Sequence, residues 1–348
     1  RRSLTLATAD AVDRYGVGLG TGVRTTSVSR LSNFMINQRL IGAVGREAES
    51  ESRLLSLGIL EANFDEYGSE GPATLMDSFF DSLSEMTRDP SNVAYRKQAL
   101  TTGTRFTDSL NRMATDLQSF RDDAINEMED TVDIIQGKLD LIADFNSRTN
   151  AASTSLGKGD FADQRDQLIA EVSQTIGGSV RFTADGLAQY FVGGHAVVTG
   201  AEARDLTVTK DASGSPKLNL STGSGTVDLT NLIGGRFGGQ LSADSEAAGY
   251  LDDLNTLAAT LATAFNTQHA AGFDSTGTAG GTFFTTTASM EAATIEIDAA
   301  LLADPGLLAA AGAATAAAGD SDNLFLMMGI ESSKLFSAGT LDATEFLG

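Results

Sequence analysis

A crowded group of charges is the first feature of this sequence that could do chemistry. Asp163-Gln164-Arg165-Asp166 places two carboxylates beside a guanidinium, and Glu171 follows them. Asp163, Asp166 and Glu171 could in principle act as acid–base carboxylates. A helix would set Asp163 and Asp166 on adjoining turns next to Arg165. This arrangement favours an ion-pair network at the start of a helix over a catalytic pair.

The histidines and cysteines of the chain argue against a metal site. His195 and His269 are the only histidines, they lie far apart in the sequence, and neither belongs to an HExxH motif. We expect His195 in a strand and His269 at a helix end, where an imidazole can bond terminal carbonyls. Cysteine is absent, which excludes disulfides and thiolate ligands. The sequence predicts no metal and no cofactor.

Three stretches have the composition of ligand-binding loops without their spacing. Residues 16–22 alternate glycine with other residues, but they lack the GxGxxG spacing and no βαβ pattern surrounds them, so a structural bend is favoured over nucleotide binding. Residues 274–277 and 320–323 begin like calcium loops, yet neither continues to the closing glutamate of an EF-hand. Asx turns or helix caps are the favoured interpretation. With no catalytic motif present, we expect no enzyme.

The composition indicates a folded, acidic protein. The 348 residues suffice for two or three domains, and a hydrophobic content of 41% is ordinary for a folded chain. The 24 basic and 46 acidic residues give a formal charge of −22, which disfavours binding to nucleic acid or to an anionic membrane. No apolar run reaches the roughly 18 residues of a membrane span. We therefore expect neither nucleic acid nor membrane as a partner.

Helical periodicity dominates the first half of the chain. Residues 1–28 look extended, a helical pattern covers 29–67, and a shorter helix follows Pro72, which suits a first turn. Residues 104–146 carry a heptad-like apolar stripe with one local slip. Its members are Phe106, Leu110, Met113, Leu117, Phe120, Ala124, Met128, Val132, Ile135, Leu139 and Ile142. Such a stripe is typical of an elongated helical bundle.

The period then changes from helical to alternating. After a break at residues 157–160, a helix is predicted from Phe161 to Gly177-Gly178, and the helical pattern returns at Glu246. Six strands are predicted between these helices, at 179–184, 187–192, 195–199, 204–209, 217–221 and 226–230. We predict an α+β fold, an elongated helical bundle domain with an inserted small antiparallel β domain. The expected boundaries are 1–177, 178–242 and 243–348.

The stretch from Ala264 to Phe284 resembles a structural joint. Apolar residues reach Phe265 at helical spacing, Asn266 and His269 bring polar groups to the helix end, and Gly272 permits a left-handed backbone. Phe273 and Asp274 then lead into a polar turn. The aromatic pair Phe283-Phe284 closes the stretch as an anchor. Nothing in it is a reactive group.

The end of the chain has a weaker pattern. Phe283-Phe284 and the pair Ile295 and Ile297 predict two short strands. Residues 309–318 are nearly all alanine, which favours helix but offers little bulk for a core. Residues 323–336 are predicted to form a final helix.

Several of these stretches together resemble the hook-associated protein 1 family of bacterial flagella. They cover nearly the whole chain in the family's order: Gly20 to Val23 with Arg30, Phe34, Gln38 and Arg39, then 161–168, 234–241, 264–284 and 319–324. Asn33 stands where an aspartate is commoner in the family. The resemblance assigns structural motif positions to Asp163, Gln164, Arg165, Asp166, Phe265, Asn266, His269, Gly272, Phe273, Asp274, Phe283 and Phe284.

The resemblance implies a non-enzymatic subunit that joins the flagellar hook to the filament. Members are exported by the flagellar type III apparatus, stack as a ring outside the cell, and contact the hook protein and a filament-side junction protein. The family's terminal motifs are not found before Arg1 or after Leu347. We therefore expect a core fragment, with ring formation and export-chaperone binding belonging to the full-length protein.

Two other functions stay open at this point. One is another flagellar axial protein, either the filament-side junction protein or flagellin, although the sequences of segments 161–168 and 264–284 disfavour both. The other is a glycan hydrolase that uses two of the many carboxylates. A deep pocket holding two carboxyl groups with perturbed pKa values would favour that enzyme.

Overall fold

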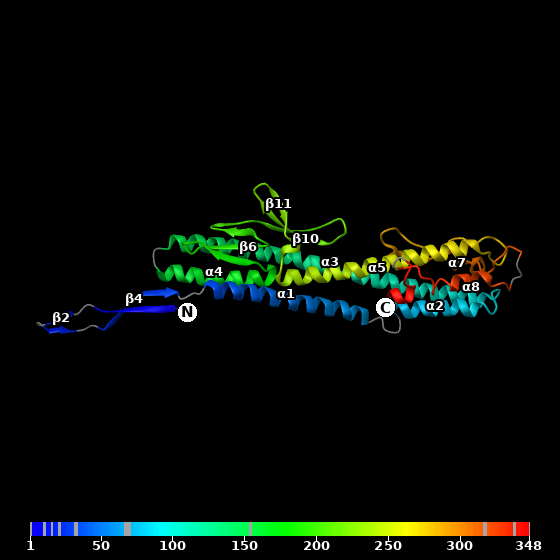
Figure 1. Cartoon of the computed structure of the whole chain (residues 1–348), viewed down its shortest axis with the longest axis horizontal. Helices are drawn as coiled ribbons and strands as arrows, with labels where there is room; N and C mark the ends of the chain where they lie inside the picture. The colour runs from blue at the N-terminus through cyan, green and yellow to red at the C-terminus, as the bar shows by residue number, and fades with distance from the viewer. Residues whose placement is uncertain are drawn as a thin grey trace. The chain divides into compact units, whose positions relative to one another are not determined.

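The chain folds into two compact units (Figure 1). The structure is a computed structural model, and it describes residues 2–9, 12–14, 17–19, 22–30, 34–65, 71–152, 155–315, 319–336 and 339–347. The first unit contains Arg1–Gly58 and Asp122–Ser245, and the second contains Ile59–Arg121 and Glu246–Gly348. Each unit has its own buried apolar residues.

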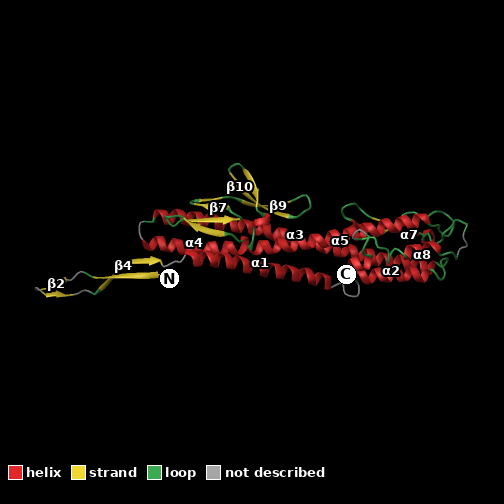
Figure 2. Cartoon of the chain, viewed as in Figure 1, coloured by secondary structure: helices red, strands yellow, loops and turns green. Residues whose placement is uncertain are grey.

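Long helices form the framework of both units, and short antiparallel sheets accompany them (Figure 2). The helices are α1 (Phe34–Asp65), α2 (Pro72–Met86), α3 (Val93–Ala151), α4 (Ser155–Ile176), α5 (Gly235–Ala271), α6 (Glu291–Thr294), α7 (Ala299–Ala303), α8 (Asp322–Met328) and α9 (Ala343–Leu347). This arrangement confirms the predicted α+β class.

The first helices begin and end near the predicted residues. Helix α1 ends at Asp65, and Pro72 occupies the first turn of α2 as expected. Ser29 and Arg30, predicted to be helical, belong to a strand instead, while residues 31–33 lie outside the described residues. Helix α3 is longer than the predicted 104–146, because its start is set by Asn92, whose side chain accepts a hydrogen bond from the amide of Ala94 at 2.9 Å.

The predicted break at residues 157–160 is wrong, since all four residues lie inside α4. Gly157 and Gly159 are poor helix formers, but they occupy the first turns of the helix. Phe161 follows them and stacks on Phe145 of α3, with ring centroids 6.2 Å apart. Packing against α3 thus overrides the low helix propensity of the two glycines.

The apolar stripe of α3 is buried along most of its length, as the spacing predicted. Phe106, Leu110, Leu117, Met128 and Ile135 are all nearly inaccessible to solvent. At the local slip the buried residue is Ile125, whereas the predicted Ala124 is half-exposed. A charged side chain that the stripe did not predict, Arg121, is also buried on this face.

Truncating the stripe is expected to destabilise the protein. Leu117→Ala and Ile135→Ala should each lower the free energy of unfolding by about 2–4 kcal/mol, because each removes methyl groups from a packed core. Ile134, the neighbour of Ile135, is 60% exposed and provides the matched control. Urea unfolding would measure the three variants. Equal midpoints for Ile134→Ala and Ile135→Ala would contradict the packing of this face.

The segment between α4 and α5 forms two antiparallel sheets in the first unit. The strands are β5 (Ser179–Phe182), β6 (Ala188–Val192), β7 (His195–Thr199), β8 (Glu202–Ala203), β9 (Leu206–Lys210), β10 (Pro216–Thr222) and β11 (Gly225–Asp228). One sheet has the order β5-β6-β7-β8 and the other β11-β10-β9. All six predicted strands are present, and His195 begins β7. The short strand β8 was not predicted.

The sheets and helices of the first unit share one apolar cluster. Tyr190, Val198 and Leu220 from the strands belong to the same cluster as Ile135 of α3 and Val172 of α4. The first compact unit groups these strands with all of α4 and with parts of α1, α3 and α5. Whether residues 178–242 form a domain of their own, with boundaries at 177/178 and 242/243, stays a prediction.

The Gly-rich stretch 234–239 opens a helix, so the predicted return of helix at Glu246 is too late. Helix α5 begins at Gly235. A Cβ at Gly239 would lie 2.5 Å from the carbonyl oxygen of Glu49 and 2.6 Å from the amide of Arg53, both in α1. Ser52 of α1 also donates to the carbonyl of Arg236 at 2.9 Å. Glycine is therefore required by the close approach of two helices, which outweighs its low helix propensity.

The N-terminal residues are extended, as predicted. Strand β1 (Arg2–Thr8) pairs antiparallel with β4 (Val23–Arg30), and β2 (Val12–Arg14) pairs with β3 (Val17–Leu19). Of the glycines assigned to a bend, Gly22 has a φ of +94°. Gly16 and Gly20 lie outside the described residues.

The end of the chain is less helical than predicted. Strands β12 (Phe284–Thr285) and β13 (Glu296–Ile297) confirm the two short strands. The final helix predicted over 323–336 ends at Met328, within α8. The described part of the alanine run, 309–315, forms no helix. Its carbonyls are used elsewhere, since Ala310 accepts from the amides of Asn323 and Leu324.

Candidate functional site

Arg165 is the buried centre of the first motif. It lies on α4 and is 1% exposed. Its Nη1 donates to the carbonyl of Gly186 at 2.8 Å, and its Nε and Nη2 both donate to Oδ1 of Asp166, at 3.2 and 3.0 Å. The guanidinium carbon also lies 5.0 Å from the centroid of the Phe182 ring. One side chain thus ties α4 to the β5–β6 hairpin.

Asn146 of α3 completes this network. Its Oδ1 accepts from Nη1 of Arg165 at 3.2 Å and from the amide of Ala188 at 2.9 Å. Its Nδ2 donates to the carbonyls of Ala188 and Gly200, at 2.8 and 2.7 Å. The four hydrogen bonds connect α3 with α4, β6 and the turn after β7. We call Arg165, Asp166 and Asn146 the α4 polar joint.

The remaining members of the first motif do not join this network in a catalytic arrangement. Asp163 and Gln164 are exposed on α4, whereas Asp166 turns toward Arg165. Glu171 pairs with Lys138 of α3 at 3.0 Å. The hydrogen bonds from Lys138 and Gln167 lower the pKa of the Glu171 carboxyl. A lowered pKa is the opposite of what a general acid needs at neutral pH.

The second motif anchors an aromatic cluster. Phe265 of α5 lies 5.4 Å from Phe283 and 5.3 Å from Phe284, measured between ring centroids, and Phe79 of α2 packs against all three. Asn266 fixes the backbone beneath these rings. Its Oδ1 accepts from the amides of Phe283 and Phe284, at 2.7 and 2.9 Å, and its Nδ2 donates to the carbonyl of Phe284 at 2.8 Å.

His269 is fully buried, and both of its ring nitrogens form hydrogen bonds. Nδ1 lies 2.7 Å from the carbonyl oxygen of Gly281, so Nδ1 carries the proton and donates. Nε2 accepts from the amide of Ala309 at 2.9 Å. The imidazole therefore joins two distant loops, and the prediction that it bonds the carbonyls of its own helix end is wrong. Burial lowers the pKa of His269, which keeps the ring neutral.

Gly272 has a different role from the one predicted. Its φ is not among the positive values of the described glycines, so no left-handed cap is formed. A Cβ at this position would lie 2.0 Å from Nδ2 of Asn323. Asn323 in turn accepts from Gln268 at 2.7 Å and donates to the carbonyl of Ala309 at 2.7 Å. Glycine is needed here because a buried amide side chain crosses directly over the helix end.

Asp274 forms an Asx turn, as the sequence favoured. Its Oδ1 accepts from the amides of Thr276 and Thr278, at 2.7 and 2.9 Å, and from the Thr276 hydroxyl at 2.7 Å. Burial opposes ionisation, but these hydrogen bonds outweigh it and lower the pKa of Asp274. Phe273 beside it pairs with Ala311.

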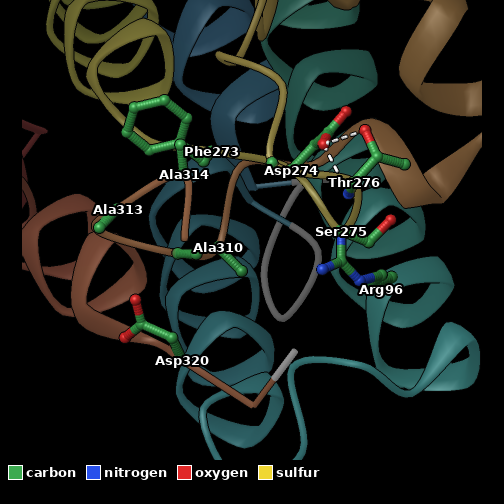
Figure 3. A pocket seen from close by; sticks show the side chains of 11 residues that line it. Arg96, Phe273, Asp274, Ser275, Thr276, Ala310, Ala313, Ala314 and Asp320 are labelled. Atoms are coloured by element: carbon green, nitrogen blue, oxygen red, sulfur yellow. Dashed lines mark hydrogen bonds between the residues drawn. The ribbon is translucent and has the colours of Figure 1, made fainter. Parts of the chain in front are cut away.

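A small pocket lies under this turn (Figure 3). Its volume is about 130 Å³, and Asp274 and Asp320 are the carboxylates in its lining. Both oxygens of Asp320 are used, since they accept from the amides of Gly312 and Asp322. The lowered pKa of Asp274 disfavours this carboxyl as the general acid of a glycan hydrolase.

Arg96 is a buried cation in the lining of the pocket (Figure 3). It donates from Nε to the carbonyl of Pro90 at 2.7 Å and from Nη1 to the carbonyls of Pro305, Gly306 and Leu308, at 3.1, 3.2 and 2.7 Å. Burial lowers the pKa of Arg96, and the nearby carboxylates of Asp274 and Asp304 counteract this effect. Arg96 thereby connects the α2–α3 turn to the loop after α7.

Sequence reasoning missed Asn146 and Arg96. Asn146 continues the buried stripe of α3 four residues after Ile142, so extending the heptad count would have found a polar residue on the core face. Arg96 carries no comparable signal, because three of its four carbonyl partners lie more than 200 residues away. Within the described ranges, no group of three or more His, Asp or Glu side chains could hold a metal ion.

Acidic pH should reduce the stability that the hydrogen bonds of His269 give to the protein. Because burial lowers the folded pKa of His269 below its ordinary 6.5, the unfolded chain takes up the proton first as the pH falls. The contribution of neutral His269 to the free energy of unfolding is complete above about pH 6.5. It is lost as the pH falls toward the pKa of His269 in the folded protein, at up to about 1.4 kcal/mol per pH unit. Urea unfolding at pH 7.5 and 5.0 would measure this loss.

The His269→Gln variant isolates the histidine from the many carboxylates that also titrate. It should be less stable than the native chain at pH 7.5 and should lose less stability on acidification. An identical pH dependence in both proteins would contradict a neutral, buried His269.

These features define a largely helical protein whose distinctive polar residues hold helices, hairpins and loops together. A solved structure supports the fold: the flagellar hook junction protein FlgK from Burkholderia pseudomallei superposes with a TM-score of 0.65 at 23% identity, covering 72% of this chain and 47% of that one. The family model "Flagellar hook-associated protein FlgK helical domain" matches residues 57–284. The chain belongs to this family, as its sequence motifs predicted.

Curated relatives agree with the family assignment. Flagellar hook-associated protein 1 of Escherichia coli and that of Salmonella typhimurium are each 26% identical over 297 residues, covering 82% of this chain. The Bacillus subtilis protein of the same name is 22% identical over 295 residues. The chain spans 54% and 53% of the Escherichia coli and Salmonella proteins, or about half their length.

Proposed function

We propose that this chain is part of a structural subunit that joins the hook of the bacterial flagellum to its filament. The observation that carries the proposal is the family match over residues 57–284. That range contains both motifs, the α4 polar joint and the inserted sheets. The relatives named flagellar hook-associated protein 1 support the same role, outside the cell at the hook–filament junction.

The subunit is not an enzyme under this proposal. The side chains that could do chemistry have structural partners instead: Arg165 holds a hairpin, His269 joins two loops, and Asp274 closes a turn.

We propose the hook protein and the filament-side junction protein as axial neighbours, with ring formation by the full-length subunit. No helix in the described part of the chain is long and apolar enough to cross a membrane.

Deletion of the gene tests the proposal. Cells without the full-length protein should assemble hooks, fail to grow filaments and lose motility, because the filament has no junction to build on. Electron microscopy of the cells would show the hooks. Reintroducing the full-length gene should restore filaments. Normal filaments in the deletion strain, without another copy of the gene, would contradict the junction role.

A further inference from the structure

Two exposed helix faces of the first unit carry the same residue pattern with opposite charge. Each face has a charged residue, a large apolar residue, a small residue and a second charge at positions i, i+1, i+4 and i+7. On α1 these are Arg39, Leu40, Ala43 and Arg46, and on α3 they are Asp133, Ile134, Gly137 and Asp140. All eight residues are exposed. We call them the basic face and the acidic face.

The charges on both faces lack oppositely charged partners among the residues that the structure describes. Among the described residues, Arg39, Arg46 and Asp133 form no ion pair, although other surface charges of the unit, such as Lys210 and Asp122, do. In the part of the chain that the structure describes, Asp140 accepts only the side-chain amide of Gln136, at 3.2 Å. Unpaired charges of one sign on each face leave both faces able to form ion pairs with an outside surface.

The apolar and small residues between these charges are exposed to solvent as well. Leu40 is 58% exposed and Ile134 is 60% exposed. Gly137 lies in the interior of α3, where glycine costs about 1 kcal/mol relative to alanine. A Cβ built at Gly137 would have no atom within 4 Å beyond its chain neighbours and its own helix backbone. Packing inside the chain therefore gives no reason for this glycine. A second helix approaching closely from outside would give one.

We propose that the basic face of one copy of this chain packs on the acidic face of another copy. Seven residues span about 10.5 Å along a helix, so the two arginines and the two aspartates have matching separations. Both ion pairs can form at once, with the small residues, Ala43 and Gly137, letting the helix backbones approach. The two faces differ, so the contact is head-to-tail and can repeat into a ring.

This contact would join neighbouring copies of the proposed junction subunit, so the inference rests on the proposed function. A single helix–helix contact of this size is weak, because exposed ion pairs contribute little and are screened by salt. It would act together with the other contacts of an assembled ring. Raising the salt concentration should therefore weaken it.

Disulfide cross-linking tests the contact on the chain itself, which has no native cysteine to interfere. Ala43→Cys and Gly137→Cys chains, mixed at high concentration and low salt under mild oxidation, should form a mixed disulfide about tenfold faster than a control pair, since docking raises the effective concentration. The control pair is Ala43→Cys with Thr226→Cys, at an exposed site of β11.

Charge reversal supplies the decisive comparison. Asp133→Arg with Asp140→Arg in the Gly137→Cys chain should reduce cross-linking to the control rate. Arg39→Glu with Arg46→Glu in the Ala43→Cys partner should then restore it. Cross-linking at the control rate, or insensitivity to both reversals, would overturn the contact. Because the assay uses isolated chains, its failure leaves the gene-deletion test of the junction role unaffected.

Discussion

Replacing Arg165 by alanine is expected to lower the free energy of unfolding by about 3–5 kcal/mol, the largest effect of any single substitution considered. The variant removes the hydrogen bonds to Gly186, Asn146 and Asp166 and the contact with the Phe182 ring. It also leaves the half-buried Asp166 carboxylate without its cation, and breaking a buried pair from one side costs that much.

The matched control for Arg165 is its neighbour. Gln164 belongs to the same motif but is exposed, so Gln164→Ala should change stability by less than about 0.5 kcal/mol. Arg165→Lys should fall between the two, because a lysine keeps the charge but cannot reproduce the fork of hydrogen bonds. Urea unfolding followed by circular dichroism would rank the variants. Similar losses for Arg165→Ala and Gln164→Ala would contradict the α4 polar joint.

Replacing Asn266 by alanine is expected to cost about 3 kcal/mol. Its amide group satisfies the backbone N–H groups of Phe283 and Phe284 and the carbonyl of Phe284, and these residues are buried. Each buried polar group left without a partner costs about 1–3 kcal/mol. The loss should be accompanied by loosening of the aromatic cluster around Phe265.

Two measurements separate this effect from a general loss of stability. Hydrogen exchange at the amides of Phe283 and Phe284 should accelerate in Asn266→Ala before the helices unfold. Thr267→Ala is the control, because Thr267 is on the same helix and its hydroxyl only donates back to the carbonyl of Thr263 at an exposed site. Unchanged exchange at both phenylalanines would show that Asn266 does not hold this loop.

The sequence predicted the parts of the fold that show a regular spacing of apolar residues. The stripe of α3 and the alternation of the six strands each follow from side chains that alternate between core and solvent. It failed where distant contacts decide. Gly157 and Gly239 are poor helix formers, yet packing against α3 and α1 places both inside helices.

The candidate residues show the same division. The motif around Arg165 was recognised from its charges, but the pairing of Asn146 with Arg165 follows only from how α3 packs against the hairpins. Gly272 was singled out for a left-handed backbone that it does not adopt, and glycine is required there by the side chain of Asn323, 51 residues further along the chain. The role of Arg96 depends entirely on loop carbonyls that the fold brings together.

The central claim, that this chain is part of the subunit between hook and filament, is tested most directly by locating the protein on the flagellum. Ser224 lies in the exposed turn between β10 and β11, so a full-length protein with Ser224→Cys as its sole cysteine can be labelled with maleimide-gold on intact cells. Electron microscopy should show gold in one narrow band at the boundary between hook and filament. Gold distributed along the filament, or absent from the flagellum of motile cells that make the labelled protein, would contradict the claim.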